Sequence, residues 1–168
     1  MASQPEFWLR GPVQGIPALL QPVAHALLQA KEEVAEALDN FPEKDLWQKP
    51  GGAASVGFHL QHLSGVLDRL FAYAEGLQLS DAQREYLLAE GREDNNIRLA
   101  ALMQHFSKQV EKALDQLART HENSLLDARE VGRKKIPSNK LGLLFHAAEH
   151  TQRHVGQLIV TAKVLRAL

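Results

Sequence analysis

Four long segments of the sequence repeat apolar residues at spacings of three and four, and this pattern restricts the chain to a helical fold. The repeats cover residues 16–40, 55–75, 94–119 and 138–168. Such spacing places the apolar side chains on one face of each helix. No segment shows the alternation of polar and apolar residues that is typical of a strand. We therefore predict an all-α fold, and the length of 168 residues fits a single domain, 1–168.

The predicted helix ends follow from capping residues and prolines. Ser55 can cap the second long helix, and Ser138 or Asn139 the last one. Pro22 is expected to shorten or kink the start of the first helix, whereas Pro17 suits a first turn.

The arrangement follows from the need to bury four apolar faces together, for which a four-helix bundle is the simplest solution. The connection between the second and third long helices is too long for a tight hairpin. Ser80 and Gln83 form the pattern of a capping box within it, which predicts a short helix that ends near Glu90. We expect this crossover to run the length of the bundle, so that the two helices that it joins are parallel. Residues 120–137 are expected to form a second connection.

Composition excludes several classes of protein. The net charge is −1 and the longest basic run is residues 133–135, which argues against nucleic-acid binding. The chain has no cysteine, which excludes disulfides, a thiolate nucleophile and cysteine-based zinc sites. We see no secretory signal and no apolar run long enough for a membrane span. We therefore expect a soluble, cytoplasmic protein with no membrane or nucleic-acid partner.

Histidines form two clusters that hold five of the eight in the chain: His59 and His62 in one, and His146, His150 and His154 in the other. Histidines four apart on a helix differ by about 400° in direction and share a face, so two of them can bind one metal ion. Such a pair alone is more often a solvated face or a hydrogen-bonded pair. Two clusters on separate helices favour a divalent metal ion held between these helices.

Helical periodicity gives these histidines different surroundings. His150 and His154 fall at the margin of the buried face, a position that suits ligands in a cleft, whereas His146 lies nearer the solvent. His59 projects towards the middle of the apolar face of its helix and His62 lies at the edge. Periodicity does not choose between the last two as a metal ligand.

Two carboxylates near the histidines have ordinary interpretations. Glu149 points about 100° away from the neighbouring His150, so we do not expect it to act as a catalytic base. Asp68 lies on the polar side of its helix and is expected to form a surface ion pair with Arg69 or another neighbour.

The sequence resembles the DinB/YfiT-like superfamily over most of its length. The resemblance rests on a loop with Trp47 and Pro50, on Ser-Val-Gly-Phe-His-Leu-Gln-His-Leu at residues 55–63, and on His-x-x-x-His-Val-Gly-Gln at residues 150–157. It implies a four-helix bundle with a long crossover between helices two and three. Trp47 is expected to pack at the bundle end.

The resemblance implies that His62, His150 and His154 are the metal ligands. His59 and His146 lie beside these positions and remain alternative ligands. Gln157 either orients a ligand or fills a polar gap.

The same resemblance implies a function class. The superfamily includes thiol-dependent transferases and isomerases that use bacillithiol or mycothiol, and members described as metal-dependent hydrolases. It therefore implies a metal-dependent transferase or hydrolase with zinc or nickel, a small-molecule substrate, and a low-molecular-weight thiol as a further cofactor. Three imidazoles leave a coordination position for water or a thiolate, the expected nucleophile, and no catalytic side chain is assigned.

Two further expectations concern the alternative function and assembly. A fourth protein ligand, most simply His59 or His146, would close the site and indicate a non-catalytic, metal-stabilised binding or scaffold protein. The ligand count therefore distinguishes the two classes. The resemblance also suggests a homodimer, and the first helix has apolar residues that could serve a partner: Leu20, Val23, Leu27 and Val34.

Overall fold

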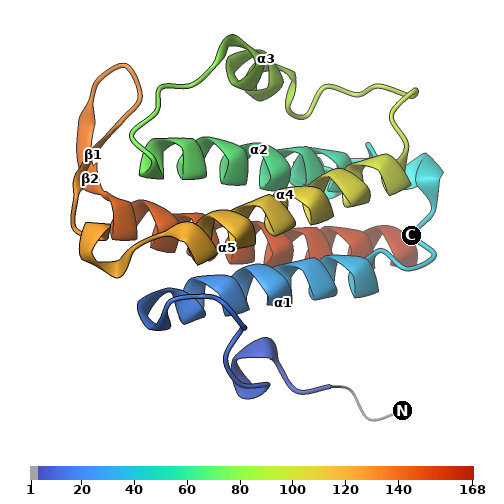
Figure 1. Cartoon of the computed structure of the whole chain (residues 1–168). Helices are drawn as coiled ribbons and strands as arrows, with labels where there is room; N and C mark the ends of the chain where they lie inside the picture. Colours follow the sequence, from blue (N-terminus) through green and yellow to red (C-terminus); the bar gives the residue numbers. More distant parts are fainter. Residues whose placement is uncertain (1–3) are drawn as a thin grey trace.

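Four long helices lie side by side in the computed structural model, which describes residues 4–168 (Figure 1). The long helices are α1 (Gln21–Ala37), α2 (Val56–Ala74), α4 (Leu99–Arg119) and α5 (Lys140–Ala167). A short helix, α3 (Asp81–Ala89), lies between α2 and α4 in the chain. Two short strands, β1 (Ala128–Val131) and β2 (Ile136–Asn139), pair as a hairpin before α5. Single 3-10 turns occupy Phe7–Leu9, Ala18–Leu20, Glu43–Asp45, Pro50–Gly52 and Glu122–Ser124.

The predicted crossover is confirmed. Helices α2 and α4 run in the same direction, and the chain between them returns along the length of the bundle with α3 at its centre (Figure 1). Helix α3 begins at the predicted capping box, in which Ser80 Oγ accepts from the amide of Gln83, and the Gln83 side chain accepts from the amide of Ser80. Helices α2 and α5 lie in contact and run in opposite directions (Figure 1). This packing brings His59 and His62 of α2 against His154 and His150 of α5.

The side-chain caps of α2 and α5 lie at predicted positions, and of the two candidates Ser138 and Asn139 it is Asn139 that caps α5. Ser55 Oγ accepts from the amide of Phe58 at 3.1 Å, and Asn139 Oδ1 accepts from the amide of Gly142 at 2.7 Å. Each cap satisfies a donor that has no partner within its helix, and so fixes the first turn of α2 and of α5.

Two predicted helix starts were too early. The first helix begins at Gln21, with Pro22 in its first turn, because the preceding residues 18–20 form a 3-10 turn. The third long helix begins at Leu99, not near Asp94. Asp94 Oδ1 accepts from the amide of Asn96 at 2.9 Å, a local turn that competes with helix formation.

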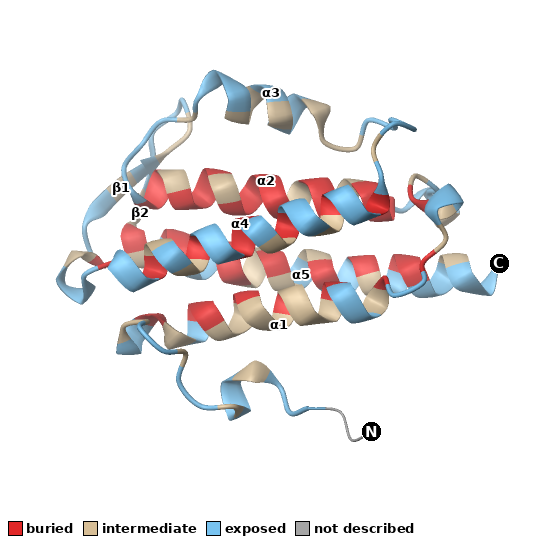
Figure 2. Ribbon diagram, turned by 45° about the vertical axis from the view of Figure 1, so that its right-hand side comes forward, coloured by how far each residue is buried: buried red, intermediate tan, exposed pale blue. Residues whose placement is uncertain are grey.

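The core contains apolar side chains from all four long helices, and Figure 2 shows that α2 is buried along most of its length. Leu20 and Leu27 are 0 % exposed, Val23 is 3 % and Val34 is 2 % exposed. The expectation that these four residues are free for a partner was therefore wrong, because the chain buries them in its own core. Among the described residues, no helix combines the length and apolar character needed to cross a membrane.

The β-hairpin was not predicted from the sequence. Its strands are four residues each, and Val131 pairs with Ile136 beside the turn. Charged residues and Pro137 interrupt the alternation of polar and apolar residues that would indicate a strand. Tertiary contacts therefore account for the hairpin better than the β-propensity of its residues. One such contact is the bond from Arg129 Nε to the carbonyl of Ala74, 2.7 Å long, at the C-terminal end of α2.

Candidate metal centre

Three histidines from two helices converge at the contact between α2 and α5. His62 Nε2 lies 2.9 Å from His150 Nε2. The ring centre of His154 lies 4.3 Å from that of His62 and 4.7 Å from that of His150. One ring nitrogen of each histidine lies within 4.8 Å of the other two, so this cluster could hold a metal ion.

Local structure explains the positions of these rings. His150 and His154 are one helical turn apart on α5, which places both on the side that faces α2. Phe58 precedes His62 by one turn on α2, and its ring stacks on the His62 imidazole with centres 5.3 Å apart and planes at 11°. This stacking restricts the rotation of His62.

The surroundings keep the α5 histidines neutral. Burial lowers the pKa of His154 to about 4, and the neighbouring imidazoles of His62, His150 and His59 act in the same direction. Burial, followed by His62 and His146, also lowers the pKa of His150. Neutral imidazole is the form that binds a metal ion, so both side chains are ready to act as ligands at neutral pH.

His150 has a ring nitrogen that the chain leaves without a partner. Its Nδ1 is buried and makes no hydrogen bond to any of the described residues, while its Nε2 faces His62. Buried polar atoms are almost always satisfied, so such an atom indicates a ligand or water that the chain itself does not supply. The three-imidazole donor set fits a metal ion bound at His150 Nε2, whereas the unpartnered Nδ1, the other nitrogen of the ring, fits a water molecule.

His59 contacts the cluster without belonging to it. The residue is 2 % exposed, and its Nδ1 lies 3.2 Å from His154 Nδ1. Burial, followed by the charge of His62, lowers the pKa of His59 to about 4. His59 therefore supports the orientation of His154, and the structure does not bring it among the three converging nitrogens.

His146 lies on the solvent side, as periodicity predicted. Its Nδ1 is 2.7 Å from Glu149 Oε1, and Arg153 Nη2 is 2.6 Å from the other oxygen of that carboxylate. His146, Glu149 and His150 form a second group close enough to hold an ion. However, Arg153 already pairs with one oxygen of Glu149, and this group contains only two histidines, so it is a weaker candidate than the three-histidine cluster.

Glu90 is the residue that sequence reasoning missed. Its Oε2 lies 2.7 Å from His62 Nδ1, and its Oε1 lies 2.6 Å from Arg69 Nη1. The short helix that the capping box opens was expected to end near Glu90, but no sequence pattern indicated which helix this residue would contact.

The remaining predicted residues have simpler roles. Asp68 pairs with Lys112 at 2.8 Å and accepts from Gln83 at 2.7 Å, so its partner is a neighbour and not Arg69. Trp47 packs at the bundle end as predicted, because a Cβ placed at Gly57 would lie 2.5 Å from its ring.

A hollow of about 590 Å³ opens beside the cluster, between the start of α2 and the exposed side of α5. Its lining consists of Ala53, Ala54, His59, Arg153, Gly156, Gln157, Val160 and Thr161. His59 therefore contacts both the hollow and His154. Gln157, expected to orient a ligand or fill a polar gap, is exposed on this wall.

Comparison with known protein families places these observations in context. The family model of the DinB superfamily matches residues 26–158, a range that includes the three converging histidines and Glu90. No curated protein matches the chain.

Proposed function

This chain belongs to the DinB superfamily, and we propose that it is a metal-dependent enzyme of the transferase or hydrolase type. In this proposal His62, His150 and His154 bind one divalent ion, zinc or nickel, and one coordination position stays open. The observation that carries the proposal is the number of protein ligands that converge.

The ligand count separates a catalytic from a structural site. The converging ring nitrogens belong to His62, His150 and His154, and no other histidine or carboxylate of residues 4–168 belongs to this group. His59 meets His154 through Nδ1, and Glu90 meets His62 on the ring nitrogen that faces away from His150. Three protein ligands with an open position are typical of catalytic zinc sites, whereas structural sites have four. This count favours an enzyme over a metal-stabilised scaffold.

The residues around the cluster would orient the ligands and hold protons. Because a carboxylate can only accept, His62 Nδ1 donates a hydrogen bond to Glu90, and the Nε2 lone pair of the neutral ring then points towards His150. The chemistry that a divalent ion supplies in such a site is a lowered pKa for a water molecule or thiol in the open position. The chain has no cysteine, so a reacting thiol would be a separate low-molecular-weight cofactor.

The hollow beside His59 supports a small-molecule substrate. Its wall combines an apolar side chain, Val160, with the polar groups of Arg153 and Gln157. A mixed lining of this kind can both bury and orient a small ligand.

Metal analysis of the purified protein, followed by activity assays, tests the proposal. We expect one ion per chain in the wild type, none in His154→Ala, and one in the control His121→Ala, which changes an exposed histidine outside the cluster. The loaded protein is then assayed for ester hydrolysis and for transfer of bacillithiol or mycothiol to an electrophile. A loaded protein with neither activity and with His59 as a fourth ligand would favour the scaffold function instead.

We also propose that the protein forms a homodimer, as the family resemblance suggests. The buried α1 residues cannot form its interface, so the contact must use other surfaces. Light scattering at micromolar concentration tests this, and a strictly monomeric mass would reject the dimer.

A further inference from the structure

We propose that Glu90 is a positioning residue that fixes His62 for metal binding and couples this binding to docking of the α2–α4 crossover. The inference rests on the proposed metal site. It concerns a residue from a different segment of the chain, which reaches the cluster only because the crossover lies against α2.

Both carboxylate oxygens of Glu90 are engaged. His62 Nδ1 donates to Oε2 at 2.7 Å, and Arg69 Nη1 donates to Oε1 at 2.6 Å. A carboxylate on the far nitrogen of a metal-binding histidine fixes the tautomer and ring orientation and raises the basicity of the ligand nitrogen. Glu90 is therefore placed to direct the lone pair of His62 Nε2 towards the two histidines of α5.

Glu90 is held in place before any ion binds. Its side chain is 5 % exposed and that of Arg69 is 10 % exposed. A buried carboxylate is strongly unfavourable without a partner, so the Arg69 pair makes this buried position tolerable. The orientation of His62 consequently does not have to be created at the moment of metal binding.

The crossover reaches α2 through contacts on both sides of Glu90. The amide of Gly91 donates to Gln61 Oε1 at 2.7 Å, and Tyr86 Oη donates to the carbonyl of Gln61 at 3.2 Å. Gly65 provides the space, because a Cβ at this position would overlap Glu90 Oε1 and lie 2.6 Å from Arg69 Nη1. The same few residues of α2 thus hold the crossover and carry the metal ligand His62.

These contacts couple metal binding to docking of the crossover against α2. If the docked crossover strengthens metal binding through Glu90, a bound ion must stabilise the docked crossover by the same factor. A merely structural role for Glu90 would hold the crossover without changing metal affinity.

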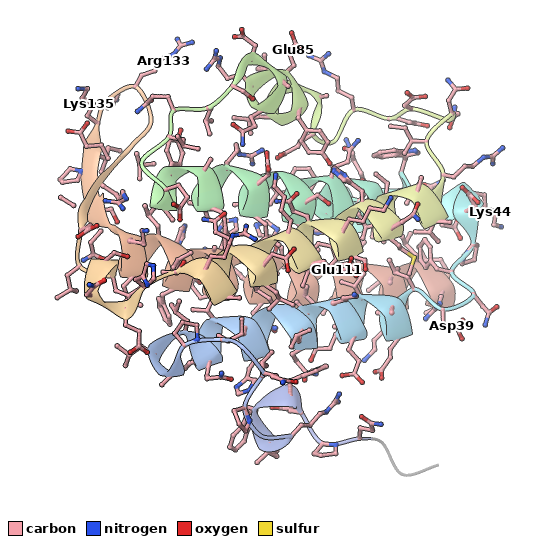
Figure 3. The ribbon with its side chains drawn as sticks, viewed as in Figure 1. Asp39, Lys44, Glu85, Glu111, Arg133 and Lys135 are labelled. Carbon is pink, nitrogen blue, oxygen red and sulfur yellow. The ribbon has the colours of Figure 1, made fainter. Side chains whose placement is uncertain are left out.

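The first test compares the zinc affinity of Glu90→Gln with that of the wild type, by competition with a chromophoric chelator. Glutamine has one carbonyl oxygen for two donors, so His62 or Arg69 loses its acceptor. We expect affinity to fall about 10- to 100-fold, the usual effect of losing such a partner. Glu85→Gln is the matched control, because Glu85 is an exposed side chain on the outer side of α3 (Figure 3). Its zinc affinity should equal that of the wild type.

A second variant disturbs the contact between Glu90 and His62 without changing the charge of the chain. Gly65→Ala should displace the Glu90 carboxylate while every ionisable group stays in the chain. We expect zinc affinity to fall in this variant as well. An unchanged affinity in Glu90→Gln would overturn the inference, and a fall in Gly65→Ala alone would not restore it.

Two further measurements separate positioning from a structural role. Nitrogen NMR should show His62 protonated at Nδ1 in the wild type and as a mixture of tautomers in Glu90→Gln. Zinc should slow hydrogen exchange at the Gly91 amide in the wild type and in Glu85→Gln, but not in Glu90→Gln. Exchange at Gly91 that zinc leaves unchanged in the wild type would also overturn the inference.

The outcomes distinguish this inference from the proposed function. If the wild type binds zinc no better than His154→Ala, the metal site itself is wrong and the inference falls with it. If the wild type binds zinc tightly, His154→Ala does not, and Glu90→Gln binds like Glu85→Gln, only the role of Glu90 is wrong.

Discussion

His62 Nε2 and His150 Nε2 lie 2.9 Å apart although the two residues are 88 positions apart in the chain. This separation is that of a hydrogen bond between two imidazoles, in which one nitrogen donates and the other accepts. A carboxylate can only accept, so His62 Nδ1 donates a hydrogen bond to Glu90. A neutral His62 then presents Nε2 as an acceptor, and His150 Nε2 is the donor of this pair. With both rings neutral, the pair has its acceptor nitrogen on α2 and its donor on α5.

Zinc binding should break the hydrogen bond between His62 Nε2 and His150 Nε2. Nitrogen ligands about 2.0–2.1 Å from a tetrahedral zinc ion lie about 3.3 Å from each other, farther apart than the two nitrogens in the metal-free pair. We expect a through-hydrogen-bond coupling between His62 and His150 in the nitrogen NMR spectrum of the metal-free protein, and its loss at one equivalent of zinc. A coupling that persists at full loading would mean that the ion does not enter between these rings.

Two helical glycines should respond in opposite ways to alanine. A Cβ at Gly57 would lie 2.5 Å from the Trp47 ring, so Gly57→Ala should lower the free energy of unfolding by about 1–3 kcal/mol, the usual effect of overpacking. Gly156 has open space around its Cβ position, so Gly156→Ala should raise that free energy by about 0.5–1 kcal/mol through helix propensity. Urea denaturation in the presence of EDTA measures both. Equal effects of the two substitutions would show that Trp47 does not pack on α2 as described.

Acid should destabilise the metal-free protein through two histidines whose pKa values are lowered in the folded state. The pKa values of His59 and His154 are lowered to about 4 in the folded state, from an ordinary value of 6.5. The unfolded chain therefore binds protons first as pH falls, and the free energy of unfolding should decrease between about pH 6.5 and 4.

The check is urea denaturation with EDTA at several pH values, for the wild type and for His59→Gln. The variant should lose less stability over this interval because it lacks one of the two imidazoles whose pKa is lowered to about 4. A free energy of unfolding that stays constant from pH 6.5 to 4.5 in the wild type would contradict the burial of these rings in neutral form.

The sequence was most informative where structure is local. The capping serine and asparagine set the starts of α2 and α5, and the four-residue spacing of His150 and His154 placed both rings on one face. That His62 joins them depends on how α2 packs against α5. Periodicity could not establish this, and the choice of His62 over His59 came from the family resemblance.

The parts that the sequence did not reveal depend on contacts between distant segments. Glu90 reaches His62 because Gly65 leaves space and Gln61 binds the amide of Gly91, and neither condition has a sequence signature. The hairpin before α5 is similar, since one of its contacts with the end of α2 is the hydrogen bond from Arg129 to the carbonyl of Ala74.

Anomalous diffraction from crystals of the zinc-loaded protein tests the central claim most directly. We predict one strong peak per chain, about 2.0–2.1 Å from a ring nitrogen of each of His62, His150 and His154, with the fourth position filled by a molecule that is not part of the chain. A peak between His146 and Glu149, or one with His59 as a fourth protein ligand, would contradict the three-histidine site with an open position.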